Sequence, residues 1–184
     1  MYTKISVQKI NDKLKVYTPY NEHFVSKAHL LRGRWQDKAW WFDEAAIVPL
    51  RELLISLWNT TGESPYEACD LLIKNYSDSA RLKPVYLFNW MIAKANSAIG
   101  NILVGSGVYL MDGTFEVGGD FNNWETVVKN ATFEIREFPV PALKLPDVRR
   151  AIAEGWCEVL TTRTRKEGGE DIEVHPTRIL LMEG

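Results

Sequence analysis

Basic and aromatic side chains gather in and just before the stretch Arg34–Phe42. The group comprises three of the seven tryptophans and four cations: Lys27, Arg32, Arg34, Trp35, Lys38, Trp40 and Trp41. Ammonium and guanidinium groups attract phosphates, while flat indole rings stack on bases, so this spacing predicts a nucleic-acid-binding surface. The same residue types also suit a strand that packs beneath helices. The sequence leaves both interpretations open.

The two interpretations differ in whether a tryptophan is exposed, because pure packing would bury Trp40 and Trp41 under different layers. A single strand over Trp35–Phe42 would place Trp35 and Trp41 on one face and Trp40 on the other, because successive side chains of a strand alternate. A sheet covered by helices on one side would therefore bury one of Trp40 and Trp41 and expose the other. An exposed indole beside Lys38 or Arg34 could stack a base, with a contribution of about 1–3 kcal/mol.

The elements that position this group are predicted as follows. Residues 4–19 form a hairpin around Asn11-Asp12, and Asn21 caps a helix that Gly33 ends. The strand over 35–42 follows, and Asp43 opens a second helix with Pro49 near its first turn. Its inward stripe is Ile47, Leu50, Leu54 and Leu57. This first unit, residues 1–62, is thus expected to be ββαβα.

The rest of the chain, residues 63–184, is predicted to be a mixed lobe rich in antiparallel strands. Ser64-Pro65-Tyr66-Glu67 is typical of a helix start and predicts a helix to about Tyr76. Residues 85–96 suit either a strand or a helix. Asp112-Gly113 predicts a hairpin turn between residues 102–111 and 114–117. The stretch 132–138 alternates like a strand.

Prolines bound a connector over residues 139–146, after which Asp147 is expected to cap a short helix to about Glu154. Residues 156–165 and 172–181 are predicted to pair as a final hairpin. The fold class expected for the whole chain is therefore α+β, in two small lobes.

Charge is divided between the lobes. Residues 1–62 hold 9 Lys and Arg against 6 Asp and Glu, a net charge of +3, and the remainder holds 13 against 18, a net charge of −5. A modestly basic first lobe is compatible with phosphate binding, while the overall net charge of −2 argues against a uniformly basic coat.

The loop Gly118–Trp124 is a second candidate recognition site. Its Asn122, Asn123 and Trp124 offer amides and a ring to a base or a peptide, although asparagines also serve turns, with Trp124 returning to the core. Gly105-Ser106-Gly107 favours a bend in a sheet over a nucleophile elbow.

No arrangement of catalytic residues can be assembled, and the three histidines lack metal-ligand spacing, so no enzyme activity, metal or cofactor is predicted. Cys69 and Cys157 lie in apolar stretches and are expected to be buried free thiols. No apolar run approaches the ~18 residues of a membrane span, and no signal-peptide core occurs, so a cytoplasmic protein without membrane contact is expected.

The first unit resembles a known family in four segments: Leu14-Lys15-Val16-Tyr17, Leu30-Leu31-Arg32-Gly33-Arg34-Trp35, Lys38-Ala39-Trp40-Trp41-Phe42 and the leucines from Leu50 to Leu54. Together, residues 13–57 look like the small HARP-type module that accompanies annealing helicases and occurs in short phage and plasmid proteins. The resemblance implies binding of DNA with single-stranded or forked character through the seven residues named above. Residues 85–140 look like the domain that follows this module in some phage-type proteins. The chain has no GxxxxGK[ST] loop and therefore no motor of that type.

Two functions are therefore expected to compete. The first is a non-enzymatic nucleic-acid-binding accessory protein of phage or mobile-element origin, with single-stranded or forked nucleic acid as its partner. The second is an interaction module that binds and modulates or inhibits a host defence or replication complex, through the acidic lobe or an exposed Trp90 or Trp124. The sequence leaves the oligomeric state open.

Overall fold

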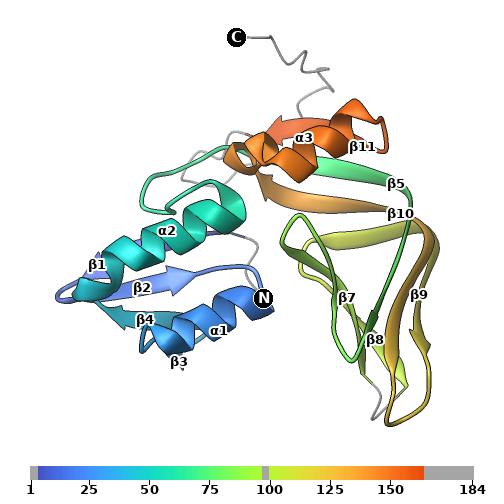
Figure 1. Ribbon diagram of the computed structural model, residues 1–184. Helices are drawn as coiled ribbons and strands as arrows, with labels where there is room; N and C mark the ends of the chain where they lie inside the picture. The colour runs from blue at the N-terminus through green and yellow to red at the C-terminus, as the bar shows by residue number, and fades with distance from the viewer. Residues whose placement is uncertain (1–3, 97–99, 164–184) are drawn as a thin grey trace.

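The computed structural model describes residues 4–96 and 100–163 and has the expected α+β class, with antiparallel strand pairing (Figure 1). The strands are β1 (Ser6–Ile10), β2 (Lys13–Tyr17), β3 (Arg34–Gln36), β4 (Ala39–Asp43), β5 (Ala68–Arg81), β6 (Val85–Leu87), β7 (Trp90–Asn96), β8 (Asn101–Val104), β9 (Val108–Gly118), β10 (Glu125–Pro139) and β11 (Cys157–Arg163). The helices are α1 (Glu22–Leu30), α2 (Ile47–Trp58) and α3 (Pro146–Ala153), and 3-10 turns span Glu44–Ala46 and Val140–Lys144. Within these residues, no helix has both the length and the apolar composition to cross a bilayer.

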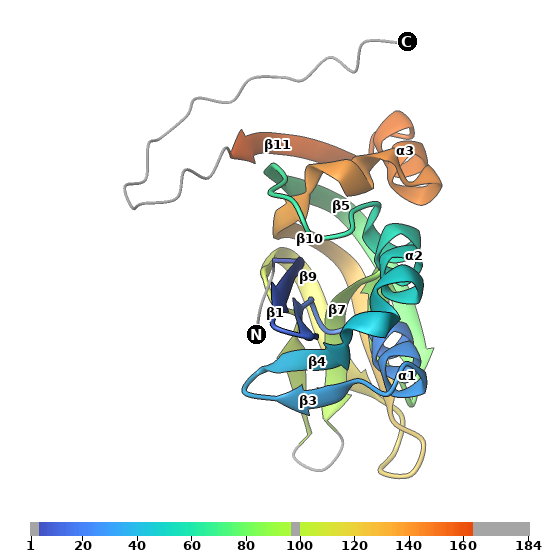
Figure 2. The same ribbon diagram turned by 90° about the vertical axis from the view of Figure 1, so that its left-hand side faces the viewer.

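The N-terminal lobe is one sheet with two helices on the same face. Its strand order is β1-β2-β4-β3, and Figure 2 shows α1 and α2 together on one side of these strands. Leu14 and Val16 of β2 alternate with outward residues and join Phe42 in a buried cluster with helix residues such as Phe24 and Leu54. Burial of this apolar face therefore holds the two helices onto the sheet.

The expected single strand over residues 35–42 is wrong, because the stretch is a tight hairpin. Asp37 and Lys38 form a two-residue turn with φ values of 51° and 60°, the left-handed backbone that joins twisted antiparallel strands. Trp35 consequently pairs with Trp40, and Arg34 pairs with Trp41. The unit is ββαββα rather than ββαβα, and Trp35 shares a face with Trp40 instead of Trp41.

The start of α1 is as expected, but its end differs in detail. The Asn21 side chain accepts a hydrogen bond from the Phe24 N–H at 2.9 Å. At the other end Arg32, with φ 59°, takes the left-handed position that Gly33 was expected to fill. The Gly33 N–H donates to the Ala28 carbonyl at 2.8 Å, which closes a Schellman motif. Gly33 is required for space, since a Cβ there would lie 2.5 Å from the Phe42 ring.

The C-terminal lobe packs a three-stranded sheet, β6-β7-β8, against a four-stranded sheet ordered β11-β5-β10-β9. The helix expected from Ser64 to Tyr76 is wrong, because residues 68–81 form β5. This strand pairs with β10 along its length and with β11 over its first half. Its buried Cys69, Leu71 and Ile73 recur with the period of two that a strand requires.

Other elements of this lobe also differ from expectation. Residues 85–96 resolve into β6 and β7, and the alternating stretch 132–138 lies in β10 as predicted. Asp112-Gly113 is not a hairpin turn, because β9 runs through it and the turn lies at residues 119–124. Cys69 and Cys157 are buried free thiols, as expected. The predicted partner strand over residues 172–181 lies outside the described residues.

Asn89 joins the two lobes. It sits in the β6–β7 turn with φ 62°, and its side-chain N–H donates to the Leu57 carbonyl at the end of α2, at 3.0 Å. Its own carbonyl accepts a hydrogen bond from the side-chain amide of Asn21, the cap of α1, at 2.9 Å. A single residue thus contacts one end of each helix in the other lobe.

Replacing Asn89 by alanine is expected to lower the free energy of unfolding by about 2 kcal/mol. One hydrogen bond of about 1 kcal/mol is lost, and alanine in the left-handed region costs about 1 kcal/mol. Asn89→Gly keeps the backbone freedom and should cost only the hydrogen bond. Urea unfolding of the two variants separates the cost of the hydrogen bond from that of the left-handed backbone. A loss of unfolding free energy below about 0.5 kcal/mol in Asn89→Ala would contradict a stabilising role for the Asn89–Leu57 hydrogen bond.

Candidate functional site

The face of the N-terminal sheet that points away from α1 and α2 carries a row of polar and aromatic side chains. The strand register places Gln8 beside Lys15, Lys15 beside Trp41, and Trp41 beside Arg34. Val7, Val16, Trp40 and Phe42, which neighbour these residues along the strands, pack with the helices, so the four side chains share the opposite face. The row crosses all four strands of the sheet.

The Trp41 ring is held in place over this face. Its indole N–H donates to the Gln36 carbonyl at 3.2 Å, across the β3–β4 hairpin. The Lys15 ammonium lies 5.3 Å from the centroid of the Trp41 ring and 5.3 Å from that of Tyr17. A cation within about 6 Å of two aromatic rings is attracted to both. Trp41, Tyr17 and Lys15, together with Arg34 and Gln8 in the same row, thus form one continuous basic-aromatic patch.

Electrostatics near the patch are dominated by cations. The Asp43 carboxylate accepts a hydrogen bond from Lys13, and that bond together with the charges of Lys13, Arg34 and Arg32 lowers the pKa of the carboxyl group. Lys9 pairs with Glu44 at the same end of the sheet. Among the described residues, Arg32 and Arg34 take part in no ion pair. The two arginines are exposed and available to an anion.

The three predicted tryptophans are divided between the two faces. Trp40 is 5 % exposed and packs among Phe24, His29 and Phe42, so it belongs to the core and cannot stack a base. Trp41 is the partly exposed member of the pair, which confirms that one faces the helices and the other does not. Trp35 is 57 % exposed, but it lies on the helix side with its ring 5.6 Å from that of Trp40.

The predicted cations are likewise spread out. Arg34 lies in the row on the open face, and Arg32 is close enough to Asp43 to affect its pKa. Lys38 sits in the hairpin turn and is exposed. Lys27 is on the last turn of α1, on the helix side of the sheet. Of the seven residues predicted from the sequence, Arg34 and Trp41 lie in the patch, whereas Lys27, Trp35 and Trp40 lie on the helix side of the sheet.

Lys15, Tyr17 and Gln8 belong to the patch, and the sequence reasoning missed them. The signal was present in Lys13–Tyr17, where Leu14 and Val16 alternate with Lys15 and Tyr17. Once Leu14 and Val16 are assigned to the core, the residues between them must face outward. Their partner in the patch, Trp41, is more than 20 positions away in the sequence.

The second candidate loop is stabilised by its own polar groups. The Asp120 carboxylate accepts hydrogen bonds from the backbone N–H groups of Asn123 and Asn122, which lower its pKa. The Asn123 side-chain carbonyl accepts a hydrogen bond from Arg81, and Trp124 is half-buried. The Phe121 side chain of this loop is 72 % exposed, and it was not among the residues predicted from the sequence.

Trp90 also differs from expectation, because it is 1 % exposed and its indole N–H donates to the Ser106 carbonyl at 2.8 Å. It therefore offers no surface to a partner. In the described part of the chain, no group of three or more His, Cys, Asp or Glu side chains is placed to hold a metal ion.

Comparison of the chain with protein-family models, with curated proteins and with solved structures finds no match. Guanidinium and ammonium groups beside an anchored indole and a phenol can hold a phosphate and stack a base at the same time.

Proposed function

We propose that this chain binds single-stranded nucleic acid across the open face of its N-terminal sheet, as a non-enzymatic accessory protein. The observation that carries the proposal is the row Lys15–Trp41–Arg34, in which an anchored ring lies between two cations. Phosphates of a strand crossing the sheet would contact the cations, and a base would stack on Trp41 or Tyr17.

Unpaired bases are required because a base within a duplex has both faces covered by its neighbours. Single strands and forks therefore fit the patch better than a continuous duplex. The resemblance of residues 13–57 to the HARP-type module supports the same substrate class and a phage or mobile-element origin. The net charge of +3 over residues 1–62 also supports contact with phosphates.

Replacing Trp41 by alanine is expected to weaken binding of a fluorescent oligothymidylate about 5-fold to 150-fold, the equivalent of about 1–3 kcal/mol of lost stacking. Trp35→Ala is the matched control, because Trp35 is the more exposed ring of the same hairpin but lies on the other face. It should change the affinity less than about twofold. Fluorescence anisotropy at ~50 mM salt measures both dissociation constants.

The contact of Arg34 with a phosphate is tested through the salt dependence of the binding affinity. Arg34→Ala should reduce the slope of log affinity against log salt by about 0.7, the amount expected for one phosphate contact on a single strand.

Two outcomes would contradict the proposal. Equal losses of affinity in Trp41→Ala and Trp35→Ala would show that the binding surface is not the open face of the sheet. Absence of binding by the wild-type chain at ~50 mM salt would refute the proposal altogether.

An interaction module for a host protein complex is the second candidate, and the exposed Phe121 favours it. This ring sits on a loop held by the Asp120 hydrogen bonds, in the acidic lobe. A rigid exposed aromatic residue is the type of anchor that protein interfaces use. Phe121→Ser should leave oligothymidylate binding unchanged, because the loop lies in the other lobe.

A further inference from the structure

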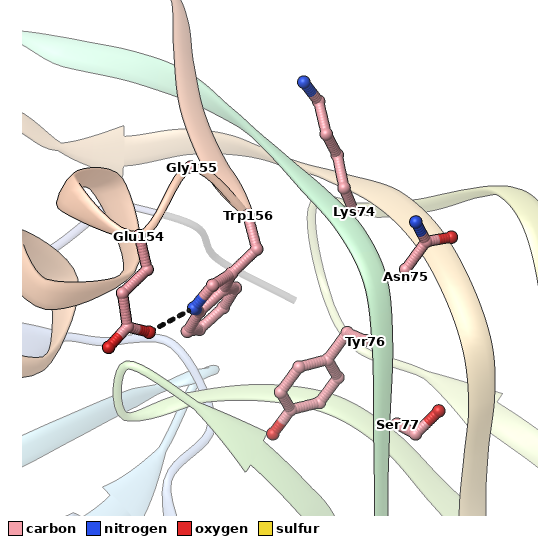
Figure 3. A pocket seen from close by; sticks show the side chains of 7 residues that line it. All are labelled: Lys74, Asn75, Tyr76, Ser77, Glu154, Gly155 and Trp156. Carbon is pink, nitrogen blue, oxygen red and sulfur yellow. Dashed lines mark hydrogen bonds between the residues drawn. The ribbon is translucent and has the colours of Figure 1, made fainter.

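An open pocket of about 540 Å³ lies beside the central strand of the C-terminal lobe (Figure 3). Its wall is formed by residues 74–77 of β5 and by residues 154–156, which connect α3 to β11. This pocket is in a different lobe from the nucleic-acid patch, and the inference drawn from it does not depend on that function.

The pocket exists because β11 covers only part of β5. The described pairing between the two strands begins at Cys157 opposite Ile73, and one further hydrogen bond runs from the Lys74 N–H to the Trp156 carbonyl at 2.9 Å. Beyond that point β5 pairs with β10 on one side only. Gly155, with φ 82°, turns the chain so that Trp156 lies beside Tyr76.

Aromatic rings form one side of the pocket. The Tyr76 and Trp156 rings lie 6.0 Å apart at 26°, and Phe88 continues the stack behind Trp156 at 5.9 Å and 18°. Both Tyr76 and Trp156 stay partly exposed. The stack fixes the two rings, so that a ligand meets a preformed surface.

Carboxylates lie in and beside the pocket. Glu154 is exposed, and its Oε2 accepts a hydrogen bond from the Trp156 indole N–H at 2.8 Å, as Figure 3 shows. Asp78 accepts a hydrogen bond from the Tyr76 hydroxyl at 3.1 Å. Among the described lining residues, Glu154 and Lys74 are the charged ones, and the Lys74 ammonium is paired with Glu158 at 2.5 Å. Because that pair neutralises Lys74, the Glu154 carboxylate is the charge left to a ligand, which favours a cationic one.

We propose that this pocket binds the guanidinium group of an arginine side chain presented by a peptide segment. A guanidinium is planar and weakly hydrated, so it stacks against aromatic rings, and its N–H groups match a carboxylate. Here the plane would lie against the exposed part of the Trp156–Tyr76 stack while an N–H donates to Glu154, which is bonded to the Trp156 ring. An ammonium group carries the same charge but is compact and strongly hydrated, and it would bind more weakly.

The test follows the Trp156 indole N–H resonance of the full chain by NMR during titration with N-acetyl-arginine amide. We expect a saturable shift, and none with N-acetyl-citrulline amide, which has nearly the same shape without the charge. Glu154→Gln keeps an acceptor for the indole but removes the charge, and it should weaken binding about fivefold or more. Glu52→Gln makes the same charge change on exposed α2 and should leave binding unchanged.

Three outcomes would overturn the proposal. The first is the absence of a saturable shift at roughly 50 mM arginine amide. The second is equal binding of the citrulline amide, or unchanged binding in Glu154→Gln, because either would show that charge plays no part. The third is binding of N-acetyl-lysine amide as tight as that of the arginine amide, which would refute the guanidinium assignment.

Discussion

Replacing Trp40 by alanine is expected to lower the free energy of unfolding by about 3–5 kcal/mol, the range for truncating a buried tryptophan. Trp40 is 5 % exposed, and its ring contacts Phe24 at 6.2 Å, His29 at 5.1 Å and Phe42 at 6.3 Å. Its removal leaves a cavity between the sheet and α1 that the fixed strands cannot close. A loss of this size is a large fraction of the 5–15 kcal/mol that holds an average domain together.

Trp41→Ala is the matched control for that experiment. The same residue type is removed one position away, but from the face opposite α1 and α2, where Trp41 is partly exposed, so we expect a loss of about 1 kcal/mol or less. Urea unfolding followed by circular dichroism compares the two variants. Equal losses would mean that both rings are buried in solution, and the nucleic-acid patch would then lose its central residue.

A second large loss is expected for Gly105→Ala, about 3 kcal/mol. Gly105 lies between β8 and β9, and its N–H donates to the Ile92 carbonyl at 2.9 Å. A Cβ at this position would lie 1.7 Å from the Met91 carbonyl oxygen, and backbone cannot move aside as a side chain can. β8 would have to separate from β7, whose residues Met91, Ile92 and Ala93 are buried.

Gly155→Ala separates this steric effect from backbone conformation. Gly155 has φ 82°, and a Cβ added there would meet no other atom within 4 Å, so alanine should cost only about 1 kcal/mol for the left-handed backbone. Thermal or urea unfolding of the two variants gives the comparison. A Gly105→Ala loss no larger than that of Gly155→Ala would contradict the close approach of β8 to β7.

Sequence and structure agree where local signals and burial act in the same direction. Asn21 caps α1 as predicted, because an amide oxygen at that position satisfies a backbone N–H whatever surrounds it. Phe133 and Ile135 are buried in β10 as their alternation indicated. Gly105-Ser106-Gly107 is the bend that its glycines suggested, where the chain passes from β8 to β9.

They disagree where pairing with a distant strand outweighs a local signal. Ser64, Pro65 and Glu67 are a good helix start, yet residues 68–81 became β5 because β10 supplies backbone partners along its length and β11 supplies them over residues 68–73. Asp112-Gly113 has turn chemistry, but β10 pairs with β9 on both sides of it. Local preferences of about 1 kcal/mol cannot compete with a sheet position inside the core.

The sequence by itself determined the α+β class, the buried stripe Leu50, Leu54 and Leu57 of α2, and the fact that one of two adjacent tryptophans must face away from the other. The strict alternation of side chains along a strand is enough for that. Only the tertiary structure decided which tryptophan is exposed, because a two-residue turn paired Trp35 with Trp40 and left Trp41 beside Lys15. It alone also brought Trp156 to Tyr76, since strand pairing joins residues that no local pattern connects.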